Sequence, residues 1–300
     1  MSEKVITSYK GFDKNMQCRN FQYEVGKEYE MDGKIKCCNR GFHACKSPLE
    51  VWDYYDMLNS RFAEVEQSGK IDKEKKSTKV CSSHIKIKAE LKLADIINIG
   101  VEWLKDITSS SKVKADGVLN DNGDRKKQIG SSGYSAKIGS SGNSAKIGSS
   151  GDYAQIGSSG NSAKIGSSGD SAKIGSSGNS AKIGSSGNSA KIGSSGNYAK
   201  IGSSGDSAQI GSSGNSAKIG SSGNYAQIDS TGEDSVIMCA GNSSIAKAKV
   251  GSWITLAEWK WSDEKKHNVP VCVKTEYVDG ENIKADTWYK LINGKFVEVN

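Results

Sequence analysis

Apolar residues recur along the middle of the chain with a fixed period of nine. Isoleucine occupies every ninth position from Ile129 to Ile237, and alanine every ninth position from Ala136 to Ala226. Within each unit, Ala and Ile lie two apart around a Lys or Gln, so both point to one side of an extended segment. Periods this short are typical of stacked coils. The pattern therefore predicts a mainly β fold with a β-solenoid over residues 128–251.

The repeating unit is Ile-Gly-Ser-Ser-Gly-Asn-Ser-Ala-Lys. We expect Asn-Ser-Ala-Lys-Ile to form the strand. Gly-Ser-Ser-Gly is expected to form the turn, with its glycines at φ values that other residues avoid. Gly-Lys-Ser/Thr phosphate loops are absent from the sequence, so these glycines are interpreted as turn residues.

Substitutions between the units indicate a coil of eighteen residues with two strands. Alternate units keep the same Asn and the same Lys, whereas the units between them vary at both positions. Duplication of eighteen-residue blocks in the gene would produce the same alternating substitutions. This alternative also makes eighteen residues the structural unit. About six such coils are expected. The invariant residues are Asn143, Asn161, Asn179, Asn197 and Asn215, with Lys146, Lys164, Lys182, Lys200 and Lys218.

The invariant lysines predict one basic face on the solenoid. Coils stack about 4.8 Å apart, so the lysines would form a ladder of like charges that a bound anion would stabilise. The other face carries Lys and Asp in equal number and is expected to be neutral. An alternative interpretation is that exposed lysines only keep a β surface soluble and prevent edge pairing. Tyr153, Tyr198 and Tyr225 replace outward Ser residues and are candidate stacking surfaces for bases.

Both flanks of the solenoid differ from it in composition. Residues 1–115 alternate like strands in places, as over 85–91, and predict an α+β domain. In this domain Ser47, Pro48 and Glu50 form the pattern of a capped helix. Residues 116–127 are expected to be a linker or entry turn. Residues 252–300 predict a small aromatic-rich β cap of two hairpins, with turns at 279–280 and 293–294.

Composition narrows the classes of function without naming one. The chain has 35 Gly and 35% apolar residues, a deficit that the repeat explains, and its net charge of +7 suits an anionic partner. Neither a signal peptide nor a membrane span is apparent, so we expect a soluble, cytoplasmic protein without membrane contact. Exposed strand edges at the ends of the solenoid make a homodimer a further expectation.

Metal and cofactor chemistry is not expected. Seven cysteines without a secretion signal indicate free thiols. Cys37, Cys38, His43 and Cys45 are a conceivable zinc set, but the regular CxxC pairs of structural zinc sites are missing. The repeat resembles the calcium-binding nonapeptide repeats of secreted toxins, which need an Asp in every unit, whereas only a minority of units here have one.

The first ninety residues resemble an uncharacterised domain of bacteriophage and prophage proteins, where it precedes short-repeat tails. The residues that carry this resemblance are 9–12, 21–29, 40–45 and 61–66. It implies a phage or mobile-element origin and supplies no activity. The location that it implies is the cytoplasm of a bacterial host.

The same region is similar to the ADP-ribosyltransferase core. That family begins with a strand that binds NAD, continues through a Gly-Arg-Gly-like turn to a helix with tyrosines, and ends with a strand that carries Glu. Residues 9–11, 40–43 with Tyr54 and Tyr55, and 61–66 follow this order. Lys10 stands where the family has Arg or His, and no catalytic Glu can be assigned. This departure favours an inactive copy.

Three functions follow from these observations. The first is a non-enzymatic, phage-type binding scaffold that engages a host protein or complex through the solenoid and inhibits a host defence system. The second is an ADP-ribosyltransferase-like enzyme with the solenoid as a docking arm. The third is binding of a polyanion or nucleic acid along the lysine ladder. We favour the scaffold, because no nucleophile with its base is apparent.

Overall fold

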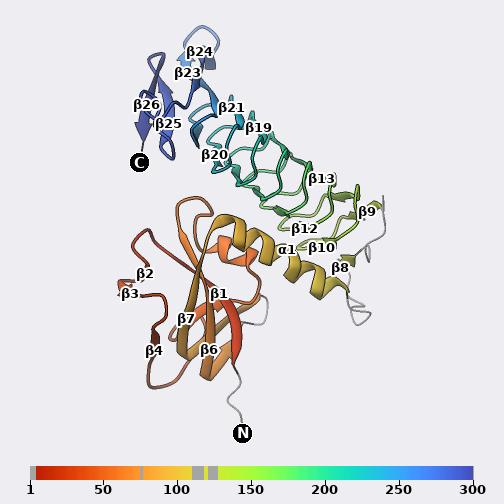
Figure 1. Cartoon of the computed structure of the whole chain (residues 1–300), viewed down its shortest axis with the longest axis vertical. Helices are drawn as coiled ribbons and strands as arrows, with labels where there is room; N and C mark the ends of the chain where they lie inside the picture. Colours follow the sequence, from red (N-terminus) through yellow and green to blue (C-terminus); the bar gives the residue numbers. More distant parts are fainter. Residues whose placement is uncertain (1–4, 75–76, 110–117, 121–127, 300) are drawn as a thin grey trace. The chain divides into compact units, whose positions relative to one another are not determined.

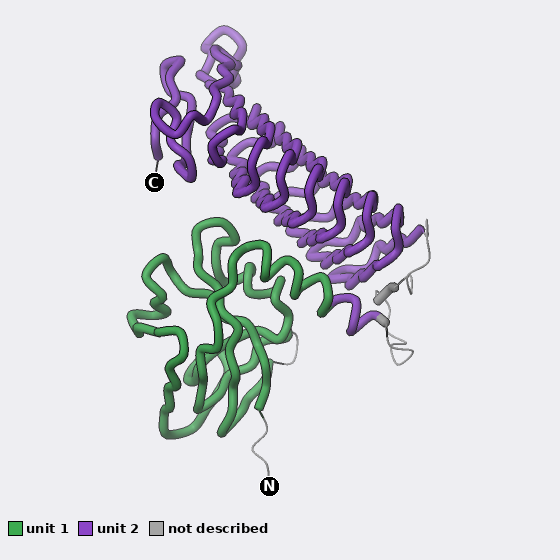
Figure 2. Tube along the Cα trace, viewed as in Figure 1, with its two compact units in different colours: residues 1–103 green, residues 104–300 purple. Residues whose placement is uncertain are grey.

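The structure of the chain is a computed structural model that describes residues 5–74, 77–109, 118–120 and 128–299. It divides into two compact units, residues 1–103 and residues 104–300 (Figure 2).

The first unit is built on an antiparallel sheet of strand order β4-β7-β5-β1-β6. Strand β6 also pairs with β7, so that β7, β5, β1 and β6 form a closed ring of strands (Figure 1). Its interior holds aromatic and aliphatic side chains that include Phe12, Phe42 and Ile85. The elements are β1 (Ile6–Phe12), β2 (Gln17–Cys18), β3 (Phe21–Gln22), β4 (Glu28–Glu30), β5 (Phe42–Cys45), η1 (Leu49–Asp53), β6 (Arg61–Lys73) and β7 (Lys79–Leu91). Helix α1 (Leu93–Ser109) begins in the first unit, and its residues from Leu104 onward belong to the second.

The expected capped helix after Ser47 is wrong in detail. Leu49–Asp53 form a short 3₁₀ helix with Pro48 at its N-cap and no side-chain capping bond. The Ser47 backbone N–H, which Glu50 would accept in a capping box, donates to Thr78 Oγ1 at 3.0 Å. Glu50 Oε2 accepts hydrogen bonds from the Thr78 backbone N and Oγ1, at 2.9 and 2.8 Å. The carboxylate therefore ties the helix to the start of β7.

The sequence interpretation did not identify α1. Its buried residues Ile97, Val101, Leu104 and Thr108 recur at helical spacing, so an apolar stripe was present to be found. Neither this helix nor any other in the described part of the chain is long and apolar enough to cross a membrane.

The second unit contains the predicted solenoid, which has about seven turns of eighteen residues with two strands in each turn (Figure 1). Its strands pair in parallel and in register, so that identical residues stack between coils. One sheet contains β8 (Val118–Asn120), β10 (Lys137–Ser140), β12 (Gln155–Ser158), β14 (Lys173–Ser176), β16 (Lys191–Ser194), β18 (Gln209–Ser212), β20 (Gln227–Ser230) and β22 (Ile245–Ala248). The other contains β9 (Gln128–Ser131), β11 (Lys146–Ser149), β13 (Lys164–Ser167), β15 (Lys182–Ser185), β17 (Lys200–Ser203), β19 (Lys218–Ser221) and β21 (Val236–Cys239).

The strand within each repeat begins at the Lys or Gln, three residues later than the expected start at Asn. Each strand is Lys-Ile-Gly-Ser or a close variant, and the Asn-Ser-Ala segment belongs to the turn. The Ile and Ala side chains are nonetheless buried, as the nine-residue pattern predicted. Of the expected linker 116–127, Val118–Asn120 form β8, and residues 116–117 and 121–127 lie outside the described residues.

The turns also use their residues differently from the prediction. The left-handed position is the Ser or Tyr after Asn/Asp, as at Ser162 with φ 57° and Ser180 with φ 57°, and no described glycine of the repeat has a positive φ. The second glycine of the unit is required for another reason. A Cβ at Gly178 would overlap the carbonyl oxygen of Gly160 in the coil before it. Close approach of successive coils therefore fixes this glycine.

A C-terminal module extends both sheets of the solenoid. Its strands are β23 (Trp253–Ser262), β24 (His267–Tyr277), β25 (Trp288–Ile292) and β26 (Lys295–Val299). The predicted hairpin at Asn293 and Gly294 is confirmed, and both residues have positive φ. The hairpin predicted at 279–280 is wrong: β24 pairs with β23, and Asp279 Oδ1 accepts backbone hydrogen bonds within a longer loop.

Candidate functional site

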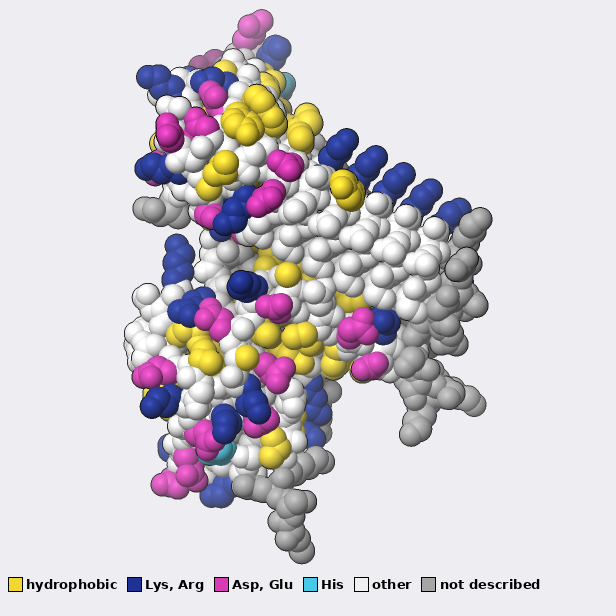
Figure 3. Space-filling model, in the orientation of Figure 1, with side chains coloured by type: hydrophobic (Ala, Val, Ile, Leu, Met, Phe, Trp, Pro, Cys, Tyr) yellow, Lys and Arg dark blue, Asp and Glu magenta, His cyan; other side chains and the backbone are white. Residues whose placement is uncertain are grey.

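The five invariant lysines lie on one face of the solenoid, each in the same position of its strand. Lys146 pairs in register with Lys164, and the same match continues through Lys182 and Lys200 to Lys218. All five side chains are exposed. Figure 3 shows basic side chains in a regular row along the solenoid. This face therefore carries the predicted ladder of like charges.

The lysines border an open groove of about 860 Å³ that runs along the solenoid axis. Its other border is formed by the strand glycines of the same coils, and we call the whole feature the lysine groove. The lysine groove is lined by Lys146, Lys164, Lys182, Lys200 and Lys218, by Gly130, Gly148, Gly166, Gly184 and Gly202, and by the intervening isoleucines with Gln128. It contains no acidic side chain.

None of the five lysine side chains has a hydrogen bond or ion pair with another residue in the described part of the chain. Lysines near the C-terminal end of the solenoid and beyond it behave differently. There Lys249 lies 2.6 Å from Asp286, and Lys260 lies 3.2 Å from Glu258. The lysine groove thus leaves its positive charge without an intramolecular counterion.

Packing does not explain the glycines of the lysine groove. A Cβ at Gly148, Gly166, Gly184 or Gly202 would meet nothing within 4 Å, and none of these residues has a positive φ. Glycine inside a strand weakens it, because it loses more backbone freedom on folding and offers no side chain to pack. What these glycines preserve is an open trough beside the lysines.

The invariant asparagines are not part of the lysine groove. They lie in the turns before the lysine strands, where Asn179 N donates to Asn161 Oδ1 at 2.8 Å and Ser162 N donates to Asn179 O at 2.8 Å. Asp152 Oδ1 accepts the same bond from Asp170 N at the other corner. The described members of this row are Asn143, Asn161, Asn179, Asn197 and Asn215. Their role in this structure is to connect successive coils.

The three tyrosines do not share a surface. Tyr153 and Tyr225 lie at the turns that lead into β12 and β20, whereas Tyr198 lies at a turn that leads into β17. All three are exposed and adopt left-handed backbone conformations. Aromatic side chains do not line the lysine groove.

An apolar extension at the C-terminal end of the lysine row was not foreseen. Val236 and Trp253 continue the positions of the lysines, and Met238 continues the position of the glycines. Trp253 packs against Tyr277 with ring centroids 5.0 Å apart. All four side chains are exposed. The sequence signal was the replacement of Lys and Gly in the last repeats.

The first unit has a cavity of about 310 Å³ beside β1 and β5. Several residues that carry the resemblance to the ADP-ribosyltransferase core line it, among them Lys10, His43, Tyr54 and Tyr55. No Asp or Glu is among the residues that line it. Glu64, in the strand that resembles the carboxylate strand of that family, is paired in register with Tyr9 and is not in the lining.

Lys10 lies inside this cavity with 4% of its surface exposed. Its Nζ donates to the His43 carbonyl oxygen at 3.1 Å and to Cys18 Sγ at 3.4 Å, and Tyr55 Oη donates to the same sulfur at 2.8 Å. Burial lowers the pKa of Lys10, and the neighbouring Cys18 opposes that shift. Burial, reinforced by the charge of Lys10, also lowers the pKa of His43.

The predicted zinc set is regrouped in the structure. Cys37, His43 and Cys81 have potential ligand atoms within 4.8 Å of one another, and Cys81 lies on β7 opposite His43. Cys38 contributes a backbone N–H to His43 Nε2 at 2.9 Å, and Cys45 lines the cavity. All seven cysteines are free thiols. Two thiols and an imidazole are ligands that zinc accepts.

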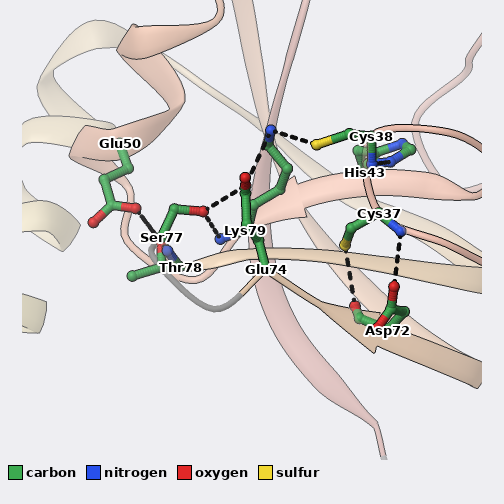
Figure 4. A network of polar contacts seen from close by, with 9 residues as sticks. All are labelled: Cys37, Cys38, His43, Glu50, Asp72, Glu74, Ser77, Thr78 and Lys79. Atoms are coloured by element: carbon green, nitrogen blue, oxygen red, sulfur yellow. Dashed lines mark hydrogen bonds and ion pairs between the residues drawn. The ribbon is translucent and has the colours of Figure 1, made fainter.

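Protein hydrogen bonds already occupy this cluster (Figure 4). The Cys37 Sγ donates to the Asp72 carbonyl oxygen at 3.3 Å, and the Cys37 N donates to Asp72 Oδ2 at 2.9 Å. Burial raises the pKa of the Cys81 thiol to about 12, with the Cys37 hydrogen bond adding to the effect. Metal binding here would therefore have to displace protons and the Cys38 N–H.

Comparison with known proteins finds a match within the first unit. Residues 6–99 match the family model described as a domain of unknown function (DUF7666). No curated protein and no solved structure matches the chain. The expected links to bacteriophage proteins and to ADP-ribosyltransferases therefore stay predictions.

Proposed function

We propose that this protein is a non-enzymatic binding scaffold whose lysine groove engages an extended acidic segment of another protein. The observation that carries the proposal is the row of five exposed lysines without intramolecular counterions beside an open glycine trough. If the lysines served only to keep the β surface soluble, the glycine trough beside them would not be needed.

The geometry favours a linear partner. Five coils at about 4.8 Å spacing place the first and last lysines roughly 19 Å apart. Neighbouring ammonium groups repel each other, and a row of carboxylates along the trough would relieve that repulsion. Glycine backbone on the trough floor allows the main chain of a peptide to approach closely.

Single-stranded nucleic acid fits the groove less well. Proteins that bind it without sequence preference combine a basic groove with aromatic side chains on which bases stack. Here the tyrosines lie at the corners of the solenoid, and the lining of the lysine groove has none. An acidic polypeptide needs no such stacking surface.

The resemblance of the first ninety residues to bacteriophage and prophage proteins suggests the class of partner that we propose. In that setting the partner is a bacterial host protein or complex in the cytoplasm, and occupying its acidic segment inhibits a host defence system. The solenoid then acts as a rigid arm, and no catalytic step is required of either unit.

A binding titration tests the proposal with the full chain. Fluorescence anisotropy with labelled poly-glutamate should show saturable binding that weakens as salt rises, because the contacts are ionic. Changing the five groove lysines to Gln should lower the affinity at least about tenfold, on the order of 1.4 kcal/mol. A matched control changes the exposed Lys14, Lys27, Lys34, Lys265 and Lys295 to Gln, which alters net charge equally.

The outcomes separate the alternatives. If the groove variant and the control variant lost affinity equally, net charge alone would explain the binding, and the proposal would be contradicted. Tighter binding of labelled oligo-dT than of poly-glutamate would replace the acidic peptide by nucleic acid. A third arm substitutes Val at Gly166, Gly184 and Gly202, where a side chain fits without clash and would fill the trough. Unchanged binding by this variant would show that the trough is not used.

A further inference from the structure

The cavity of the first unit has the size of a small-molecule site. Its volume of about 310 Å³ lies at the lower end of the range for pockets that enclose a ligand of drug size. It is lined by residues of β1, of β5 and of the β2–β3 hairpin, which contains Cys18 and Arg19. Every lining residue belongs to residues 9–79, so the site is complete within this unit.

The cavity holds cations without anions. Lys10 is almost fully buried, and its hydrogen bonds go to a carbonyl oxygen and a thiol. Arg19 is exposed at the cavity and has no hydrogen bond or ion pair with another described residue. A buried charge is costly unless a counter-charge pairs with it. Lys10 and Arg19 therefore leave room for a negatively charged group.

The third basic residue of the lining is engaged elsewhere. Lys79 Nζ lies 3.3 Å from Glu74 Oε2 and 4.2 Å from the centroid of the Tyr54 ring (Figure 4 shows the contact with Glu74). Burial opposes its ionisation, but Tyr54, Cys38 and Glu74 together raise the pKa of Lys79. Lys79 therefore forms part of the cavity wall. The positive charges without a counterion are those of Lys10 and Arg19.

The walls are aromatic. The Phe21 and Tyr23 rings pack with centroids 4.8 Å apart, and Lys10 Nζ lies 5.3 Å from the Tyr23 ring. Phe21 is 44% exposed and Tyr54 is 48% exposed, although both line the cavity. Flat apolar surface beside fixed positive charge suits a ligand that combines a ring with an acid group.

Part of the backbone around the cavity adopts the left-handed conformation. Within the first unit, the described non-glycine residues with positive φ are Met16, Arg19, Asn20 and Cys38, at 61°, 51°, 62° and 65°. Arg19 and Cys38 line the cavity. Met16 directly precedes β2, and Arg19 and Asn20 form the two-residue turn between β2 and β3. Residues held in this region cost free energy and concentrate at binding and active sites.

We propose that this cavity binds a small organic anion with a planar ring. Its carboxylate or phosphate group is held by Lys10 and Arg19, and its ring packs against the aromatic wall that contains Phe21 and Tyr23. The proposal concerns a small ligand of the first unit and is independent of the polymer proposed for the lysine groove.

Calorimetric titration of the full chain tests this site. The probes are benzoate and phenyl phosphate, with inorganic phosphate and neutral benzyl alcohol as comparisons. At least one ring-bearing anion should bind at one site with Kd of about 1 mM or tighter. Inorganic phosphate should bind at least about tenfold more weakly, and benzyl alcohol should show no saturable heat up to about 10 mM. The two planar probes distinguish a carboxylate ligand from a phosphate ligand.

Substitutions assign the binding to the cavity. Lys10→Met should lower the affinity at least about tenfold, and Arg19→Gln at least about threefold. Lys14→Met, an equal charge change on an exposed residue outside the lining, should leave it unchanged. The variant with Gln at the five groove lysines should bind the small anion normally, which separates this proposal from the proposed function.

Three results would overturn the inference. The first is no saturable binding of either planar anion up to about 10 mM. The second is unchanged affinity in Arg19→Gln, a variant at an exposed position that decides the matter if Lys10→Met fails to fold. The third is equal binding of benzyl alcohol, which would show an apolar site without a role for charge.

Discussion

Glycine has two different roles in this repeat, as a comparison of Gly178 with Gly184 shows. Gly178 faces the carbonyl oxygen of Gly160, so successive coils can approach each other only if no side chain is present. Gly184, six residues later in the chain, faces open space. The sequence shows both simply as glycines of the nine-residue repeat, because the distinction depends on which atoms the neighbouring coil presents.

A pair of alanine substitutions tests this distinction. Gly178→Ala should lower the free energy of unfolding by about 1–3 kcal/mol, because the added methyl group forces the coils apart. Gly184→Ala should be neutral or stabilising by up to about 1 kcal/mol, because alanine loses less backbone freedom on folding. Urea unfolding followed by circular dichroism measures both. Equal destabilisation by the two substitutions would contradict the two roles.

The side-chain contacts between neighbouring strands differ between the two units. The solenoid stacks identical residues in register, and its turns add hydrogen bonds from each coil to the next through Asn or Asp Oδ1. This acceptor explains why Asn and Asp interchange at that position, since both offer it. In the first unit the partners are unlike residues that meet across antiparallel strands, and salt bridges such as Arg61 with Glu90 contribute there.

The Arg61–Glu90 pair across β6 and β7 should give a pH-dependent contribution to stability. Arg61 Nε and Nη2 donate to the two Glu90 oxygens, both at 2.6 Å, and these bonds lower the pKa of Glu90. A carboxyl group with a lowered pKa stabilises the fold above its unfolded pKa of about 4.3 and loses this contribution as pH falls through its folded pKa.

Arg61→Gln should therefore destabilise the chain at pH 7 and leave its stability unchanged at pH 3. Both side chains are 40% exposed, so the expected loss at pH 7 is at most about 1 kcal/mol. Thermal unfolding of Arg61→Gln, Glu90→Gln and the double variant at both pH values measures the coupling. A loss of the same size at pH 3 would attribute the effect to packing of the Arg side chain.

At the scale of the whole molecule, the C-terminal module terminates the solenoid. Strand β23 pairs in parallel with β21 and then in antiparallel fashion with β24, whereas β22 pairs with β25. Each sheet of the solenoid thus ends in an antiparallel hairpin. Parallel strands of a solenoid otherwise offer open edges that can pair with another copy.

Removal of residues 253–300 should expose the edges of β21 and β22 and cause association. The shortened chain is expected to show a mass that rises with concentration, because open strand edges pair with one another. Size-exclusion chromatography with light scattering measures this against the intact chain. A shortened chain that stays monomeric at every concentration would show that the module is not needed as a cap.

The sequence by itself determined the solenoid, its eighteen-residue coil and the row of five lysines, because these properties follow from periodicity and from which residues face the same way. The tertiary structure decided what periodicity does not contain. It placed the asparagines in hydrogen-bonded turns and separated the tyrosines between two corners. It grouped Cys81, in place of Cys38 and Cys45, with Cys37 and His43. It also enclosed Lys10 in a cavity with Arg19 and aromatic rings from distant positions. Such neighbours depend on how strands and loops fold over one another, and local pattern carries no record of that.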